Sequence, residues 1–472
     1  MKASPVFKTA LRPALVVVAI LGAPALAGAD TGNDLEPHEV LARDILEELV
    51  ETDTTDSTGD NTAAAQAMGE RLLAAGFAGE DVEILAPAPR KGNLIARYRG
   101  REPGLKPLLL LAHLDVVEAD ERAWSRDPFE FAEEEGYFYG RGVSDDKDEA
   151  AIHVANLIRL RKAGYKPGRD IVLALTADEE GGDYNGVQWL LDSYPDRLDA
   201  EYVLNEGGGG VLIGGERLAN EVQLTEKLYQ TFVIETRSRG GHSSMPTDDN
   251  AIHAITEVIR RLREYRFPVR LNPVTEAFFA RSRELNTGRS REAMEGILRT
   301  PPDRESIDFL ARNPFYNAMM RTTCTPTLIR GGHAENALPQ RAALTVNCRL
   351  LPDDSRDRIE RTIRSLVGDD ASIEGVAAID LRPEATMRDD VLEVIERVSR
   401  SVWPAVPVIP IMGPGGTDGR FLRNLGIPVF GANGIFIDVE DDRAHASDER
   451  IRVRSFFEGQ EFLYRLTRAL SE

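Results

Sequence analysis

Two short stretches of this sequence carry side chains of the types that bind metal ions. The first is His113 and Asp115, which close the apolar run Leu108 to Leu111. Residues two apart on a strand point to the same side, so His113 could bind a metal while Asp115 holds its other ring nitrogen. The second is Asp145 and Asp146, at the start of a helical pattern, where two carboxylates repel each other unless a cation lies between them. Together they suggest a divalent metal site.

Three further acidic side chains follow strand patterns. Glu179 and Glu180 come just after the strand pattern 171–176, and Glu206 follows the pattern 202–205. Singly, such residues are commonly solvated, His-x-Asp is an ordinary hydrogen-bonded pair, and Asp-Asp is a helix cap. The carboxyl ends of parallel strands, however, gather ligands at one edge of a sheet. Three strands that end in such residues favour a shared site over solvation.

The elements that would position these residues alternate between helices and strands. Apolar residues recur every four positions in 41–49 and 64–72, which predicts two amphipathic helices, and strand patterns follow at 82–85, 93–98 and 108–112. This order predicts an α/β fold with a mixed, mainly parallel sheet.

Near Tyr229 the pattern changes to antiparallel strands and a helix, which indicates a separate small α+β domain. We expect this small domain at 229–351, inserted between two parts of the larger domain, 37–228 and 352–472. The stretch 268–318 within it has no assigned place.

The 472 residues carry a formal net charge of −21, spread over the chain. Phosphate binding requires the opposite sign, so nucleic acid is not an expected partner. Only two cysteines are present, Cys324 and Cys348. An oxidising compartment could join them, and two buried thiols are the alternative.

The first 29 residues have the layout of a secretory signal peptide. Lys2, Lys8 and Arg12 precede an apolar run, and small residues follow up to Ala27 and Ala29. A membrane anchor is the alternative, but the apolar run is shorter than the roughly 20 residues that a span requires. We expect an exported protein, periplasmic or extracellular, without a membrane span after cleavage.

Eight residues, taken in order, resemble the motifs of one known family. They are His113, Asp115, Asp145 in SDDK, Glu179 and Glu180 in DEEGG, Glu206 in NEGG, His242 in GGHSSMP and His445 in AHASDE. The sequence resembles the two-metal amidohydrolases and exopeptidases that include aminoacylase, glutamate carboxypeptidase, succinyl-diaminopimelate desuccinylase and acetylornithine deacetylase. It departs from them at Asp148, where the family usually has glycine.

The resemblance implies a zinc-peptidase catalytic domain with two zinc ions, cobalt or manganese being alternatives. Asp145 would bridge the metals, with His113 and Glu206 on one and Glu180 and His445 on the other. Glu179 would act as the general base, and Asp115 would orient His113. A cis peptide bond after Asp145 is also implied.

By the same resemblance the small domain is a lid through which the chain forms a homodimer. His242 would reach the partner's active site and stabilise the oxyanion. Asn336, Arg349 and the backbone at Gly415 and Gly416 would hold the substrate's carboxylate.

The function implied is an exported di-zinc hydrolase that cleaves an amide or peptide bond next to a free carboxylate. It would be a carboxypeptidase or an N-acyl-amino-acid deacylase, with a small peptide or N-acyl amino acid as substrate. The alternatives are a dipeptidase with the same site and an exported binding protein without catalysis.

Overall fold

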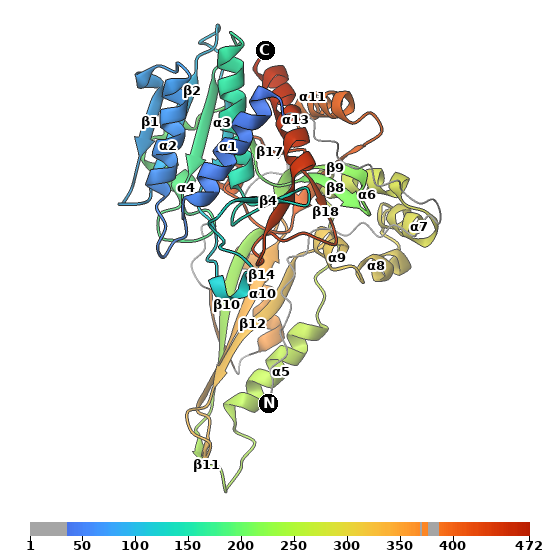
Figure 1. Cartoon of the computed structure of the whole chain (residues 1–472). Coiled ribbons are helices and arrows are strands. Elements are labelled where there is room, and N and C mark those ends of the chain that lie inside the picture. Colours follow the sequence, from blue (N-terminus) through green and yellow to red (C-terminus); the bar gives the residue numbers. More distant parts are fainter. Residues whose placement is uncertain (1–34, 369–370, 376–386) are drawn as a thin grey trace.

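The computed structural model describes residues 35–368, 371–375 and 387–472 and has a broad α/β part from which a narrow part projects (Figure 1). The predicted signal peptide, residues 1–29, lies outside the described residues. Within the ranges described, none of the helices combines the length and the apolar character that a membrane span needs.

A mixed sheet of ten strands forms the centre of the large domain. Its middle is parallel, since β3 pairs in parallel with both β6 and β7, and β7 with β17. The sheet order is β1 (Val82–Leu85), β2 (Asn93–Tyr98), β6 (Ile171–Thr176), β3 (Leu108–His113), β7 (Tyr202–Asn205), β17 (Val429–Gly431), β9 (Glu216–Glu226), β8 (Gly209–Ile213) and β18 (Phe436–Asp438), with β16 (Val408–Gly413) also on β9. The predicted fold class is confirmed.

Helices cover both faces of this sheet because its central strands are apolar on both sides. Leu110 of β3 packs in one core, and its neighbours Leu109 and Leu111 pack in the core on the opposite face. Burial of each such leucine contributes about 1.5–3 kcal/mol relative to exposure. The first face carries α1 (Pro37–Glu51), α2 (Asn61–Ala74), α3 (Lys147–Lys162), α11 (Asp389–Val402) and α13 (Val453–Ser471), and the second carries α4 (Gly186–Ser193) and α12 (Gly419–Asn424).

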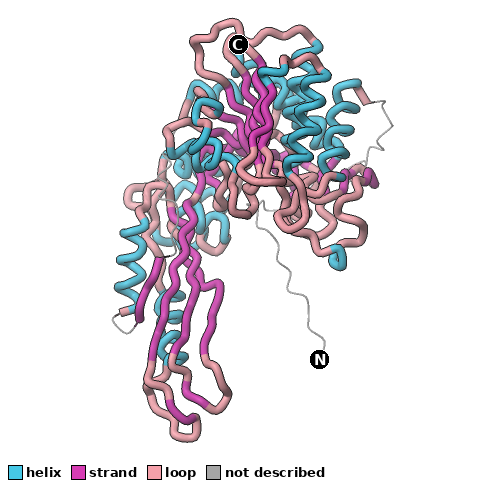
Figure 2. Tube along the Cα trace, turned by 90° about the vertical axis from the view of Figure 1, so that its left-hand side faces the viewer, coloured by secondary structure: helices cyan, strands magenta, loops and turns pink. Residues whose placement is uncertain are grey.

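The small domain is a four-stranded antiparallel sheet with its own core. Residues from α5 (Ala251–Glu264) and α10 (Arg356–Val367) fill this core against the sheet. The strand order is β12 (Thr323–Gly331), β14 (Arg341–Leu350), β10 (Leu228–Arg237) and β15 (Ala371–Gly375). Figure 2 shows the long strands running away from the large domain. At their far end lie β11 (Gly241–His242) and β13 (Ala337–Leu338).

The sequence-based division places residues 352–375 in the large domain. In the structure β15 pairs with β10, and Ile359 and Ile363 of α10 lie in the core of the small domain. The chain therefore stays in the small domain until about residue 375.

The stretch 268–318 forms four short helices that pack on the large domain rather than on the small one. Phe278, Phe279 and Phe315 belong to the same core as the central sheet, and the first helix contacts β16. The helices are α6 (Pro273–Ser282), α7 (Gly288–Ile297), α8 (Arg304–Leu310) and α9 (Pro314–Met320).

A three-stranded sheet combines strands from both parts of the large domain. It consists of β4 (Ala132–Glu134), β5 (Tyr137–Tyr139) and β19 (Arg450–Arg452), in which β19 pairs with β5. The described residues also include four short 3₁₀ helices, η1 (Gly79–Asp81), η2 (Glu121–Ala123), η3 (Pro195–Arg197) and η4 (Arg283–Leu285).

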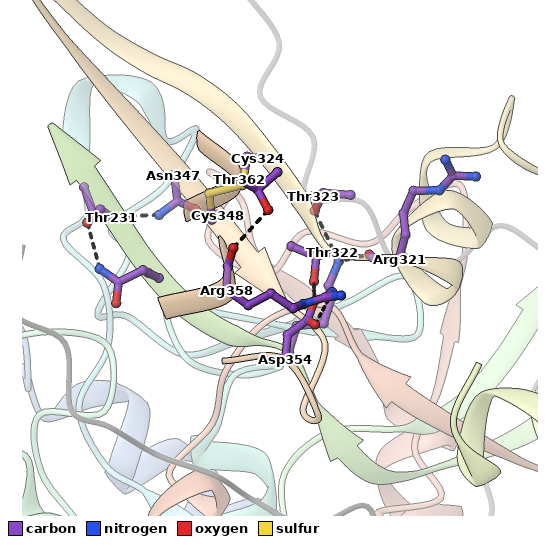
Figure 3. Close-up of a disulfide and its surroundings, with 12 residues drawn as sticks. Thr231, Arg321, Thr322, Thr323, Cys324, Asn347, Cys348, Asp354, Arg358 and Thr362 are labelled. Carbon is purple, nitrogen blue, oxygen red and sulfur yellow. Dashed lines mark hydrogen bonds and ion pairs between the residues drawn. A yellow bond between two sulfur atoms is a disulfide. The ribbon is translucent and has the colours of Figure 1, made fainter. Parts of the chain in front are cut away.

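Cys324 and Cys348 form a disulfide between β12 and β14, which decides between the two alternatives that the sequence left open (Figure 3). The bridge lies close to the place where the chain passes between the domains. There, the buried Asp354 carboxylate accepts a hydrogen bond from Thr322 and pairs with Arg358 (Figure 3).

Candidate active site

Five segments deliver polar side chains to one edge of the central sheet. His113 ends β3, Glu179 and Glu180 follow β6, and Glu206 follows β7. The other two come from outside the parallel strands: Asp145 from the turn before α3, and His445 from the loop between β18 and β19. All six residues that the sequence proposed as metal ligands or base meet here.

Asp145 lies between the two histidines. One carboxylate oxygen, Oδ1, is 3.1 Å from His113 Nε2, and the other, Oδ2, is 3.1 Å from His445 Nε2. His445 Nε2 is also 2.6 Å from Glu180 Oε1. A carboxylate with one oxygen turned to each histidine has the arrangement of a bridging ligand between two cations. The peptide bond between Asp145 and Asp146 is cis, as the resemblance implied.

Two overlapping groups of ligand atoms are compact enough for metal ions. The atoms of His113, Asp145 and Glu180 lie within 4.8 Å of one another, and so do those of His113, Glu179 and Glu206. Neutral imidazole and carboxylate oxygens are ligands that suit zinc. The second group includes Glu179, so this residue lies close enough to the metal position to act on what is bound there.

The charges of the site fit cations as well. Burial, and then the neighbouring Glu179, raise the pKa of Glu206 well above its usual value. One oxygen of Glu206, Oε1, is buried and has no hydrogen-bond partner among the described residues. Hydrogen bonds to Asp145 and Glu180 raise the pKa of His445 to about 10, so these carboxylates attract positive charge. Divalent cations bound here would stabilise the buried Glu206 carboxylate and neutralise the negative charge of Asp145 and Glu180.

Asp115 contributes differently from the sequence prediction. The His113 ring bonds through Nδ1 to the backbone carbonyl of Asp115 at 2.9 Å, and the Asp115 carboxylate is farther away, at 3.6 Å. The carboxylate instead accepts the backbone N–H groups of Glu179 at 3.1 Å and Glu180 at 2.9 Å. With Nδ1 as the donor, Nε2 of His113 presents its lone pair to the site. Asp115 therefore holds both the imidazole and the loop of the two glutamates.

A cavity of about 1050 Å³ opens beside this cluster. Its lining includes Glu179, Glu180 and His445, together with Arg349, Gly415 and Gly416 from the predicted carboxylate-binding set. The structure thus brings three of the four predicted substrate-binding residues to the cluster.

Arg349 is a free cation in this cavity. Its guanidinium lies over the Tyr229 ring, 4.8 Å from the ring centroid, and no carboxylate pairs with it in the ranges that the structure describes. Burial lowers the pKa of Arg349. An anion that entered the cavity would satisfy this charge.

His242 and Asn336 lie elsewhere. Both are exposed at the far end of the small domain, where His242 pairs with Ala337, and Ser243 donates its N–H to the Asn336 carbonyl at 3.1 Å. Figure 1 shows β11 at the end most distant from the central sheet. These two residues do not reach the site of their own chain.

Among the cavity residues that sequence reasoning missed are Arg420 and Tyr229. Arg420 Nη1 is 3.7 Å from Glu179 Oε1, and Tyr229 is largely exposed, at 58%. Arg420 comes only four residues after Gly416 in the sequence, so a cation close to the predicted substrate-binding glycines was the available signal. Nothing in the periodicity distinguishes Tyr229 from other strand aromatics.

Comparisons with known proteins found a family model, relatives and solved structures that this chain resembles. A family model described as peptidase family M20/M25/M40 matches residues 109–469. The human N-fatty-acyl-amino acid synthase/hydrolase PM20D1 is 28% identical over 382 residues, which cover 78% of this chain and 75% of that protein.

Two solved structures share the fold. An M20 family metallo-carboxypeptidase, Sso-CP2 from Sulfolobus solfataricus, has a TM-score of 0.65 at 17% identity and covers 91% of this chain and 99% of its own. The Bacillus subtilis YXEP protein, a dinuclear metal binding peptidase from the M20 family, has a TM-score of 0.58 at 12% identity, with 92% and 98% covered.

Proposed function

The chain belongs to peptidase family M20/M25/M40 and is a metallohydrolase of amide bonds with a dinuclear metal site; from this premise we propose that it cleaves the amide or peptide bond next to a free carboxylate. It acts as a carboxypeptidase or as an N-acyl-amino-acid deacylase. The observation that carries the proposal is the arrangement around Asp145, whose two oxygens face two histidines, beside a cavity that contains the unpaired Arg349.

His113, Asp145 and Glu206 would hold one metal ion, and Asp145, Glu180 and His445 the other. Zinc suits this donor set, with cobalt or manganese as alternatives. Bound there, two such ions supply water that is acidic enough to ionise near neutral pH, and they polarise the substrate carbonyl.

Glu179 takes the proton of the attacking water and passes it to the leaving nitrogen. Its side chain is only 9% exposed and lies within the ligand-atom group that includes His113 and Glu206. Burial, followed by the nearby Asp418 carboxylate, raises the pKa of Glu179, which favours a group that can carry the proton between the two steps.

Arg349 binds the substrate's carboxylate. Its planar fork can donate two parallel hydrogen bonds, and the Tyr229 ring beneath it keeps the guanidinium in place. Backbone at Gly415 and Gly416 lines the same cavity, where the absence of side chains leaves room for the substrate. Arg420, next to Glu179, adds a second cation on this wall.

The cavity does not restrict the acyl group of the substrate to a short chain. A cavity of about 1050 Å³ is at the upper end of the range for small-molecule sites. The name of the human relative, an N-fatty-acyl-amino acid synthase/hydrolase, makes long acyl chains a class worth testing.

A homodimer completes the site. His242 and Asn336 act in the partner's cavity, because they lie at the end of the small domain that is most distant from the central sheet of their own chain. The edge strand β12 supports this proposal, since Leu328 and Ile329 on it are 57% and 59% exposed, and Ile252 of the neighbouring α5 is 42% exposed. An unpaired edge strand with apolar side chains is a template for pairing with another chain. Light scattering should give a dimer for the wild type and a monomer for the double variant Leu328→Lys, Ile329→Lys.

We also propose export through the signal peptide at 1–29. The Cys324–Cys348 disulfide supports an oxidising compartment, because disulfides persist there and are rare in the cytosol.

One experiment separates the candidate substrates. Purified protein is assayed on N-acetyl and N-long-chain-acyl amino acids, C-terminally amidated counterparts and dipeptides, each with and without a chelator. The proposal expects chelator-sensitive hydrolysis of substrates with a free carboxylate and little hydrolysis of their amides. Preference for dipeptides alone would favour the dipeptidase alternative, and hydrolysis that is equal with and without the carboxylate would refute the role of Arg349.

A further inference from the structure

Two loops that carry predicted metal ligands are joined through one buried side chain, Glu449. Asp145 belongs to the turn that follows β5, and His445 belongs to the loop that precedes β19. These strands pair with each other, so the two loops leave the same short sheet. Glu449 is the last residue before β19 and is completely buried.

The Glu449 carboxylate holds the backbone directly before Asp145. Its Oε1 accepts the N–H of Ser144 at 2.9 Å, and its Oε2 accepts the N–H of Gly142 at 3.2 Å. The same Oε2 accepts a hydrogen bond from Arg141 Nη1 at 2.6 Å. Three donors from one turn therefore converge on one carboxylate.

Arg141 also contacts the loop that carries His445. Its second nitrogen, Nη2, donates to the carbonyl of Ala446 at 3.2 Å, next to His445. Arg141 and Glu449 are both almost fully buried, with side chains that are 3% and 1% exposed. The pair thus fixes the distance between the turn that ends in Asp145 and the residue that follows His445.

His445 has less support of its own than His113. Its side chain is 46% exposed and its backbone φ is +62°, in the left-handed region. His113 is the last residue of a central strand, and its ring is held by the Asp115 carbonyl. Loss of the Glu449 contacts would free His445 and leave His113 in place.

We propose that Glu449 is a positioning residue for the metal position formed by Asp145, Glu180 and His445. The inference rests on the two-metal function proposed above and adds that the two positions depend on different supports. Asp145 belongs to both positions, but removal of the Glu449 contacts weakens this position more than the one formed by His113 and Glu206, because only this one also depends on the His445 loop. Partners that orient ligands typically change metal affinity by roughly 10- to 100-fold.

Glu449→Gln tests this with little change in volume. The amide has a single accepting oxygen, and its NH₂ group would face an N–H donor of the turn, while Arg141 loses its charged partner. Zinc binding to chelator-stripped protein is measured by calorimetry and by metal analysis after dialysis at buffered zinc concentrations. We expect one equivalent that is weakened roughly 10- to 100-fold and another that is weakened clearly less.

Glu226→Gln is the matched control. Glu226 is also buried, and it accepts hydrogen bonds from Arg423 Nη1 at 2.8 Å and from the Thr417 N–H at 2.7 Å, but neither donor lies in a loop that carries a predicted metal ligand. This variant should lose thermal stability and keep both zinc affinities. Arg141→Lys provides a second test if Glu449→Gln does not fold, since one ammonium replaces the two guanidinium nitrogens that bind Glu449 and Ala446 separately.

Wild-type protein that binds fewer than two equivalents would contradict the proposed function itself. Two equivalents in the wild type, with unchanged affinities in both Glu449→Gln and Arg141→Lys, would overturn only this inference. An equal loss at both positions would also overturn it, because the two supports would then not be separate.

Discussion

The buried histidine His153 should make the protein lose stability in mild acid. It lies on α3, is 1% exposed, and neither ring nitrogen has a hydrogen-bond partner in the described part of the chain. Burial lowers its pKa from 6.5 to about 4. The folded state therefore keeps the ring neutral at a pH where the unfolded chain already protonates it.

The sign follows from proton uptake. Between pH 6.5 and pH 4 the unfolded state binds more protons at His153 than the folded state does, so stability falls as the pH is lowered through this window. Linkage with these two pKa values gives a loss of about 2 kcal/mol at pH 5 and about 3 kcal/mol at pH 4 and below.

His153→Leu removes this linkage and two buried unpaired nitrogens. Urea unfolding, followed by tryptophan fluorescence with chelator present so that metal release does not contribute, is compared at pH 7 and pH 5. The wild type should lose about 2 kcal/mol more than the variant between these pH values. His253→Leu is the control, because it removes an exposed imidazole on α5 instead of a buried one. Equal pH dependence in the wild type and His153→Leu would refute the reasoning.

Three substitutions test the chemistry. Glu179→Gln should keep both metals by elemental analysis and lower kcat roughly 10²- to 10⁴-fold, since it removes the base; a loss of metal would identify Glu179 as a ligand. Arg349→Lys should raise KM about 10-fold for substrates with a free carboxylate and leave hydrolysis of their amides unchanged, because the bidentate pairing is lost. A mixture of His242→Ala and Glu179→Gln protomers should recover activity that neither variant has alone, and a mixture that stays inactive would exclude action of His242 across the dimer.

The meeting of the ligands at one sheet edge was predictable from the sequence. His113, Glu179 and Glu206 each follow an apolar run of strand length, and parallel strands place such residues together. Asp145 and His445 come from loops. The repulsion of the Asp145–Asp146 pair connected Asp145 with a metal site, whereas only the resemblance to a family connected His445. Their distances depend on side chains such as Glu449, which no periodic pattern reveals.

Other features could not be predicted from the sequence, because they depend on contacts between residues that are far apart in the chain. The spacing of Ile359 and Ile363 indicates a helix but not which core receives it. The stretch 268–318 had no assigned place, because its aromatic residues find their packing partners only in the core of the central sheet. Asp115 was expected to bind the His113 ring through its side chain, but its own carbonyl lies closer and the carboxylate is taken by two backbone N–H groups.

The most direct test of the two-metal centre is an anomalous difference map of crystals of zinc-loaded protein. The account predicts two peaks about 3.5–4 Å apart on either side of the Asp145 carboxylate, one beside His113 and Glu206 and the other beside Glu180 and His445. A single peak, or peaks away from Asp145, would contradict it.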